Sequence, residues 1–280
     1  MSAGILPGME SIVVNGLKTA YHAGGLGPKP LLFVHGWASS GRMWLRSMWA
    51  FRHEYRMWAI DLPGCGASAS PDMAWRSIER YTDHLAAFCE ALDIRPYAVI
   101  GHSMGGRIAF DFARRYPDRV EKLVAISPAL TGRLGYNLDL LLVGGLVGSA
   151  MKFLRRLWPI ATAETMSLYW APKYLGSEAV KRTTTDMRRV SWETATGSLR
   201  AMVRQDFSPK LAEVPHPTLL IHGQRDYTVP PDDSRIASRR LSDSQILELR
   251  GVHHQPTDEA QGQTLDAMRS FLANGRSGQA

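Results

Sequence analysis

The chain reads Gly101-His102-Ser103-Met104-Gly105 directly after the apolar run 97–100, and an amphipathic stretch follows from residue 106. This order predicts a buried strand, a tight turn and a helix, with the serine held on the turn in a strained backbone conformation. Glycines suit the flanks of such a turn, because the strand and helix backbones approach each other closely there. The N–H of Met104 opens the predicted helix, where unpaired donors favour negative charge. We therefore predict that Ser103 is a nucleophile and that the backbone N–H of Met104 is one oxyanion donor.

Four other short motifs each follow a predicted strand: His35-Gly36-Trp37, Asp61-Leu62-Pro63-Gly64-Cys65-Gly66-Ala67-Ser68, residues 223–230 and residues 251–256. Together with the turn at Ser103, they resemble the α/β-hydrolase superfamily over nearly the whole chain. The resemblance implies an α/β fold with a mostly parallel central sheet, flanking helices and a helical cap insertion. It also implies a catalytic triad in the chain order Ser103, Asp226, His254. The backbone N–H of Trp37 occupies the family's place for the second donor of the oxyanion hole.

Asp226 is the acid that the resemblance implies. In that role it has to be buried and ionised, so that it holds the imidazole in the useful tautomer. The alternative is an aspartate that only forms a turn, which Gly223 and Pro230 would also suit. The family's other location for the acid follows the strand that ends at Ile126, and there the chain offers Ser127-Pro128 without a carboxylate. This favours Asp226.

Two adjacent histidines are candidates for the general base. His254 precedes Gln255-Pro256, in the way that the family histidine commonly precedes x-Pro, and His253 stands where relatives usually have glycine. A shift by one residue would turn the ring away from the serine. We predict that His254 is the base and that His253 packs in the loop as a polar residue.

Three further histidines stand beside the predicted motifs. We expect His35 to shape the oxyanion turn through hydrogen bonds and His102 to contact the underside of the site, and we assign both to the substrate pocket. His222 closes a predicted strand and is interpreted as structural. None of the histidines has metal-ligand spacing with a carboxylate, and the chemistry needs neither a metal nor an organic cofactor.

Composition excludes several other classes of protein. Of 280 residues, 45% are hydrophobic and 21% charged, which is ordinary for a globular protein. The net charge of +7 comes mostly from arginines scattered along the chain, which predicts a solvated surface and not a nucleic-acid interface. Two cysteines are too few for a disulfide framework.

The first residues show no signal peptide, which predicts a cytoplasmic location. The sequence does not decide between a monomer and a homodimer.

The pattern along the chain predicts one core and one insertion. A hairpin is expected at 11–21 around Asn15-Gly16, and strands alternate with helices from 31 to 127 and again from 217 to 272. Between these blocks the chain is apolar and helical, without predicted strands. We therefore expect a core of residues 1–130 and 208–280 and a helical cap, or lid, of residues 131–207.

The cap holds an apolar segment at 138–148, which is too short and too glycine-broken to span a bilayer. Basic residues follow it, so docking at a membrane interface is an alternative, but a cap helix over the site is favoured. Within the cap we assign Trp158 and Trp170 to the substrate pocket. We expect no stable membrane insertion.

These features predict a carboxylesterase-like serine hydrolase that acts on small-to-medium lipophilic esters, because the cap shows no obvious charge clamp. Ser103 argues against haloalkane dehalogenases and epoxide hydrolases, which carry aspartate there, and Met104 argues mildly against proline iminopeptidase-like enzymes. Carbon–carbon bond hydrolase, thioesterase, lactonase and haloperoxidase-like activities stay open on the same site. The alternatives from other classes are a non-catalytic binding protein and an acyltransferase.

Overall fold

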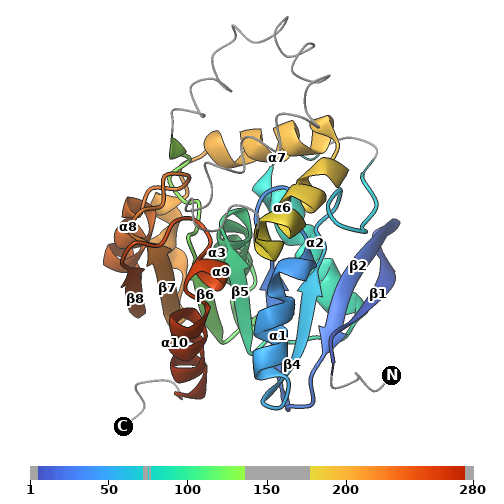
Figure 1. The fold of residues 1–280 in the computed structure, drawn as a ribbon, viewed down its shortest axis with the longest axis horizontal. Coiled ribbons are helices and arrows are strands. Elements are labelled where there is room, and N and C mark those ends of the chain that lie inside the picture. The colour runs from blue at the N-terminus through green and yellow to red at the C-terminus, as the bar shows by residue number, and fades with distance from the viewer. Residues whose placement is uncertain (1–5, 72–74, 76, 136–176, 275–280) are drawn as a thin grey trace, which may run out of the picture.

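An eight-stranded sheet forms the centre of the molecule (Figure 1). The computed structural model describes residues 6–71, 75, 77–135 and 177–274. The strand order is β1-β2-β4-β3-β5-β6-β7-β8. The strands are β1 (Gly8–Val14), β2 (Leu17–Gly24), β3 (Lys29–Val34), β4 (Tyr55–Ile60), β5 (Ala98–His102), β6 (Lys122–Ile126), β7 (Thr218–Gly223) and β8 (Ser244–Leu249). In this order, each strand from β4 to β8 pairs in parallel with the next one. β1 pairs antiparallel with β2, and β2 pairs antiparallel with β4, so the predicted mostly parallel sheet is confirmed.

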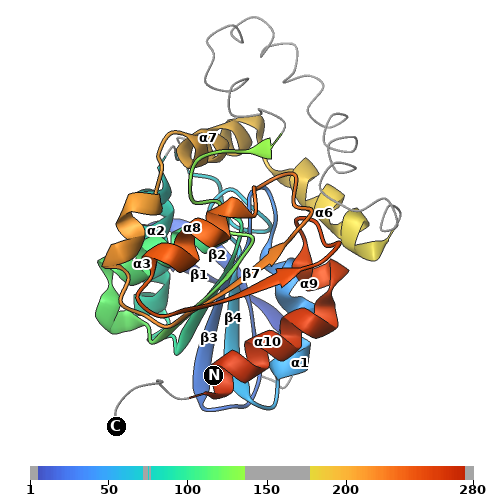
Figure 2. The same cartoon turned by 90° about the vertical axis from the view of Figure 1, so that its left-hand side faces the viewer.

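Helices cover both faces of this sheet (Figure 2). On one face lie α2 (Ile78–Ala91), α3 (Met104–Arg115) and α8 (Asp232–Arg240), and on the other lie α1 (Leu45–Phe51), α9 (Pro256–Glu259) and α10 (Gln261–Ala273). Two buried apolar clusters fill the two layers between sheet and helices. Short 3₁₀ turns occur at Gly41–Trp44, Pro117–Arg119 and Ser208–Glu213. The result is the α/β sandwich expected from alternating strands and helices.

The hairpin at the start of the chain follows from its turn residues. Asn15 and Gly16 both have positive φ, at 48° and 79°, which is the backbone that a two-residue hairpin turn requires. Val14 pairs with Leu17 across the turn, and this register places β2 between β1 and β4.

Two further helices, α6 (Glu178–Arg189) and α7 (Trp192–Val203), lie above the edge of the sheet where the parallel strands end (Figures 1 and 2). The apolar segment 138–148 and the predicted pocket residues Trp158 and Trp170 lie outside the described residues. Within the described ranges, no helix combines the length and the apolar character needed to cross a bilayer.

The last helix is held by a buried lysine at the start of β6. Lys122 is 3% exposed, and its Nζ donates to the carbonyl of Phe271 at 2.8 Å and to that of Asn274. The hydroxyl of Tyr97 donates to the neighbouring carbonyl of Leu272 at 2.9 Å. A cation at a helix C-terminus satisfies carbonyls that have no helical partner and opposes the negative end of the helix dipole. These bonds fasten α10 to the sheet.

We predict that Lys122→Met lowers the free energy of unfolding by about 1–2 kcal/mol, because the helix-end carbonyls lose a charged donor while the aliphatic stem is kept. Urea unfolding followed by circular dichroism measures the loss. Lys29→Met is the matched control. The ammonium groups of Lys29 and Lys122 both lie over the Tyr97 ring, 4.2 and 5.4 Å from its centroid, but Lys29 is exposed at the start of β3. Equal losses in the two variants would contradict the proposed capping role.

Candidate active site

Ser103 stands on a strained turn between β5 and α3. Its backbone has φ 53° and ψ −115°, a conformation that costs a non-glycine residue free energy, and the residue is 5% exposed. The strand and helix meet so closely that a Cβ on Gly101 would lie 2.3 Å from the carbonyl oxygen of Gly105. A Cβ on Gly105 would lie equally close to the carbonyl oxygen of Val34, on the neighbouring strand. Glycine is therefore required at both positions, as the sequence pattern predicts.

The oxyanion loop touches this turn from the end of β3. A Cβ on Gly36 would lie 3.2 Å from the Cβ of Ser103, so the glycine lets the loop pass directly beside the serine. Trp37 follows, and its indole Nε1 donates to the carbonyl of Ala195 in α7 at 2.8 Å. Met104 is the first residue of α3, where a backbone N–H has no acceptor within the helix. The two predicted oxyanion donors thus belong to the two segments that meet at Ser103.

Asp226 lies in the loop after β7 and is 4% exposed. Its Oδ1 accepts from the backbone N–H groups of Thr228 and Val229, at 2.8 and 2.9 Å. Its Oδ2 lies 2.7 Å from Nδ1 of His254 and 3.1 Å from Nε2 of His222. Burial alone would raise the pKa of this carboxyl, but the nearby His254 and the hydrogen bonds from both rings outweigh burial and hold its pKa well below the usual range.

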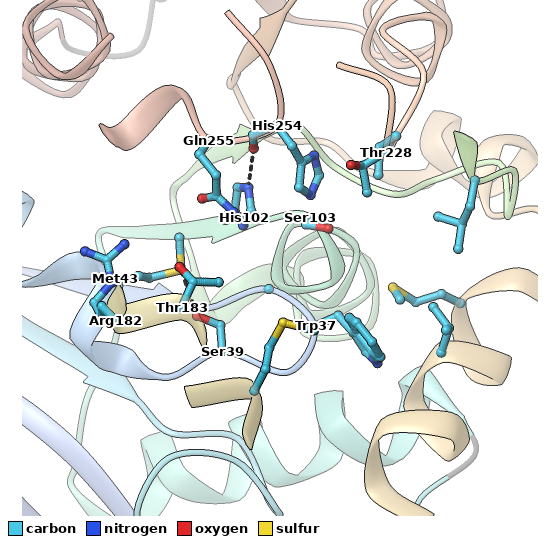
Figure 3. A pocket seen from close by; sticks show the side chains of 16 residues that line it. Trp37, Ser39, Met43, His102, Ser103, Arg182, Thr183, Thr228, His254 and Gln255 are labelled. Carbon is cyan, nitrogen blue, oxygen red and sulfur yellow. Dashed lines mark hydrogen bonds between the residues drawn. The ribbon is translucent and has the colours of Figure 1, made fainter. Parts of the chain in front are cut away.

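His254 follows β8 and is 3% exposed. Because its Nδ1 faces a carboxylate, the neutral ring carries its proton there and keeps a lone pair on Nε2. The imidazole lies next to Ser103 in Figure 3, and both residues line one pocket. His254 and Asp226 are therefore in direct contact beside the predicted nucleophile, although 28 residues separate them in the chain.

The neighbouring His253 turns away from this pair. Its Nδ1 lies 3.2 Å from Oε2 of Glu259, and the same carboxylate accepts from the backbone N–H of His253 and of Gln255. Glu259 thus ties down the loop on both sides of His254.

His102 supports the loop from below. Its Nε2 donates to the backbone carbonyl of His254 at 2.8 Å, and the two rings lie 4.8 Å apart. Burial and the nearby His254 lower the pKa of His102 to about 3, so its ring stays neutral. His102 also lines the pocket, where the sequence places it.

His35 has a different place from the one assigned to it. It is fully buried, and both ring nitrogens contact the backbone: Nδ1 lies 2.7 Å from the carbonyl of Gly36 and Nε2 accepts from the N–H of Leu62 at 2.9 Å. It is not among the described residues that line the pocket. His35 therefore shapes the oxyanion turn through hydrogen bonds, as expected, but it does not line the substrate pocket.

The pocket above Ser103 combines a polar floor with apolar walls (Figure 3). Besides Gly36, Trp37, His102, Ser103 and His254, its described lining consists of Ser39, Met43, Leu134, Arg182, Thr183, Met187, Leu199, Met202, Thr228, Val229 and Gln255. None of these was predicted to line the pocket, because they come from six separate parts of the chain. Among the described residues, no group of three or more histidine, cysteine, aspartate or glutamate side chains is arranged to hold a metal ion.

Helix α6 bridges the two loops that flank the pocket. Its Arg182 pairs with Asp258 of α9 at 2.8 Å, just after the histidine loop, with both side chains largely buried. One turn further along the helix, Asp186 is fully buried and accepts from Ser40 at 2.6 Å and from Arg42 at 3.2 Å, just after the oxyanion loop. A single helix is thus fixed to both loops by charged hydrogen bonds.

We predict that His254→Ala lowers kcat/KM for an ester substrate at least about a thousandfold, because the serine loses its proton acceptor. His253→Ala is the matched control and keeps kcat/KM within about tenfold of wild type, because His253 contacts Glu259 and not Asp226. Steady-state kinetics on both variants distinguishes them. The assignment is wrong if only His253→Ala abolishes turnover.

We predict that Arg182→Met lowers the free energy of unfolding by about 3 kcal/mol, because it leaves the Asp258 carboxylate buried without its charged partner. Arg42→Met is the control, with a loss below about 1 kcal/mol, because Arg42 is 40% exposed and Ser40 still donates to Asp186. Urea unfolding measures both changes. A larger loss for Arg42→Met would contradict this ranking.

Comparison with known proteins places the chain in a family. Residues 29–261 match the family model described as serine aminopeptidase, S33. The chain is 26% identical over 254 residues to a pimeloyl-[acyl-carrier protein] methyl ester esterase of Nitrosospira multiformis, covering 83% of this chain and 89% of that protein. It is 29% identical over 252 residues to the magnesium-chelatase 30 kDa subunit of Rhodobacter capsulatus, covering 84% and 85%.

Solved structures share the fold. The enol-lactonase from Burkholderia xenovorans LB400 superimposes with a TM-score of 0.82 at 19% identity, covering 95% of this chain and 100% of that one. A hydrolase from Pseudomonas aeruginosa PA01 gives 0.80 at 21% identity, covering 95% and 98%. The family match spans most of the chain and the neighbours share its sheet and helices. The chain therefore belongs to the serine aminopeptidase S33 family of α/β-hydrolases, a hydrolase family with esterases among its relatives.

Proposed function

We propose that the protein hydrolyses carboxylic esters through a covalent acyl-enzyme on Ser103. The observation that carries this proposal is the buried contact of 2.7 Å between Asp226 and His254, whose ring lies beside a serine on a strained turn. A nucleophile, a base and a group that orients the base are the three parts that serine hydrolysis needs.

In the proposed reaction, Nε2 of His254 takes the proton of Ser103 while the serine oxygen attacks the ester carbonyl. Asp226 stabilises the imidazolium that forms and stays ionised itself, which agrees with its lowered pKa. His254 then gives the proton to the leaving alcohol, and the carbon–oxygen bond to the alcohol breaks. Water attacks the acyl-enzyme by the same steps and releases the acid, and Ser103 regains its proton.

The negative charge of the tetrahedral intermediate falls on the former carbonyl oxygen. We assign its stabilisation to the backbone N–H groups of Trp37 and Met104, which lie on the two segments that meet at Ser103. The loss of one such donor typically slows a reaction by a hundredfold to a thousandfold. The anchors of the oxyanion loop, His35 and the indole of Trp37, support this geometry.

The pocket supports a neutral, small-to-medium lipophilic ester as the substrate. Its apolar wall includes Met43, Met187, Leu199 and Met202, and its charged residue Arg182 is already paired with Asp258. No aspartate or glutamate belongs to the described part of the lining, where an aminopeptidase would need an anion to bind the substrate's ammonium group. The relative from Nitrosospira multiformis, a methyl ester esterase, agrees with ester chemistry.

We also propose that residues 131–207 act as a cap over a core of residues 1–130 and 208–280. Helices α6 and α7 supply Arg182, Met187 and Leu199 to the pocket wall, and Trp37 binds α7 directly. The chain enters this region at Leu130 and Thr131, whose N–H groups donate to the buried Asp233 of α8 at 2.6 and 3.0 Å.

We predict that the protein reacts with a fluorophosphonate serine probe and hydrolyses p-nitrophenyl esters, with short-to-medium acyl chains preferred because the cap restricts the pocket. Ser103→Ala abolishes labelling and lowers kcat at least about a thousandfold. Ser127→Ala is the matched control: this serine also follows a parallel strand with positive φ (46°) and is fully buried, yet it contributes nothing to the proposed reaction.

Three outcomes would count against this function. An unlabelled wild-type protein without turnover would indicate a binding protein. Labelling with faster transfer to added alcohols than to water would indicate an acyltransferase. Better turnover of long-chain lipids than of short esters would contradict the predicted substrate size.

A further inference from the structure

His222, next to the end of β7, contacts the acid of the proposed triad. Its side chain is fully buried. Nε2 lies 3.1 Å from Oδ2 of Asp226 and 3.1 Å from the backbone carbonyl of Val229, and Nδ1 lies 2.7 Å from the hydroxyl of Ser234 in α8. Both ring nitrogens therefore have partners within hydrogen-bond distance.

These partners determine which nitrogen of the ring carries the proton. The two atoms that face Nε2 are a carboxylate oxygen and a carbonyl oxygen, which only accept hydrogen bonds, so Nε2 carries a proton. A hydroxyl can donate or accept, so in the neutral ring Ser234 donates to the lone pair of Nδ1. Ser234 thereby favours the tautomer in which His222 donates to Asp226.

The same carboxylate oxygen serves two imidazoles. Oδ2 of Asp226 accepts from His254 at 2.7 Å and from His222 at 3.1 Å, while Oδ1 is held by two backbone N–H groups. The bond to His222 prevents rotation of the carboxylate and takes up part of the charge that His254 would otherwise face alone.

We propose that His222 is a positioning residue of the triad: its Nε2–H holds Asp226 in place and shares the charge of Oδ2 with His254. This inference rests on the proposed function, because it assigns a role relative to Asp226 and His254. The sequence pattern places His222 only as a structural residue at a strand end.

The charged surroundings fix the sign of the expected effect. The titratable groups near His222 are Asp226 in the acid loop, His254 in the histidine loop, His102 at the end of β5, Asp233 on α8 and Glu248 on β8. Removal of the His222 donor leaves these groups in place but concentrates the charge of Oδ2 on His254. The imidazolium that forms in the reaction then faces the full charge of the carboxylate, so the acid limb of kcat/KM moves to higher pH.

The test compares two substitutions at His222 with the same two at a control histidine. His222→Leu removes the donor, and His222→Gln keeps an N–H near the position of Nε2. His216→Leu and His216→Gln are the matched controls, because His216 is also a buried histidine next to β7, but its Nε2 faces the carbonyl of Pro117, away from the site. For each protein, kcat, KM and the pH profile of kcat/KM are measured with a p-nitrophenyl ester, and the melting temperature is recorded.

We expect His222→Leu to lower kcat about tenfold to a hundredfold with little change in KM, and to move the acid limb upward by about 0.5 to 1 pH unit. His222→Gln restores most of the kcat and returns the acid limb toward the wild-type position. The His216 variants lower the melting temperature without moving the pH profile. The inference is overturned if the leucine and glutamine variants of His222 behave alike, or if His216→Leu moves the acid limb as far as His222→Leu.

A second readout separates this inference from the proposed function. In protein labelled with ¹⁵N-histidine, nitrogen chemical shifts report which ring nitrogen is protonated, and His222→Gln identifies the signals by their loss. Protonation of His222 on Nε2, with a downfield proton that changes in Asp226→Asn, supports the inference even if no ester is turned over. Protonation on Nδ1 alone refutes it even if the protein is an active esterase.

Discussion

The buried carboxylate of Asp226 is the constraint on which the site depends. Burying an ionised carboxylate costs several kcal/mol unless donors replace the lost water. The chain supplies four N–H groups: two from the acid loop itself, one from strand β7 and one from the loop after β8. Each donor is satisfied only when these segments have their observed arrangement. The charge that orients His254 therefore also holds the loops beside Ser103 together.

Much of this arrangement could be predicted because it depends on local backbone geometry. The approach between Gly101 and Gly105, and the positive φ of Asn15 and Gly16, are written in short runs of residues. Parallel strands end at the same edge of a sheet, so motifs that follow successive strands are expected to meet. This is why the sequence placed Ser103, Asp226 and His254 at one edge, and the contact between Asp226 and His254 agrees with that placement.

The contacts of the cap could not be predicted in this way. Helix α6 carries Arg182 and Asp186 among other charged residues, and nothing in its sequence distinguishes the two buried ones from those facing solvent. Their partners lie 76 and 146 residues away along the chain. From the composition of the cap we expected no charged side chain that would bind a substrate charge. In the structure Arg182 does line the pocket, but its charge is neutralised by the ion pair with Asp258.

The histidines show why residue type alone does not identify a base. A neutral imidazole offers one donor and one acceptor at a fixed separation, so a buried ring can connect two segments without burying a charge. His35 connects Gly36 to Leu62, and His102 holds the carbonyl of His254; burial lowers the pKa of both, which keeps the rings neutral. His254 differs from these two rings, because the partner of its Nδ1 is a carboxylate and its ring lies next to Ser103. A base is therefore recognised by a carboxylate partner together with a place beside the serine. His253 faces Glu259 and His222 shares Asp226, but neither belongs to the described pocket lining that holds His254 and Ser103.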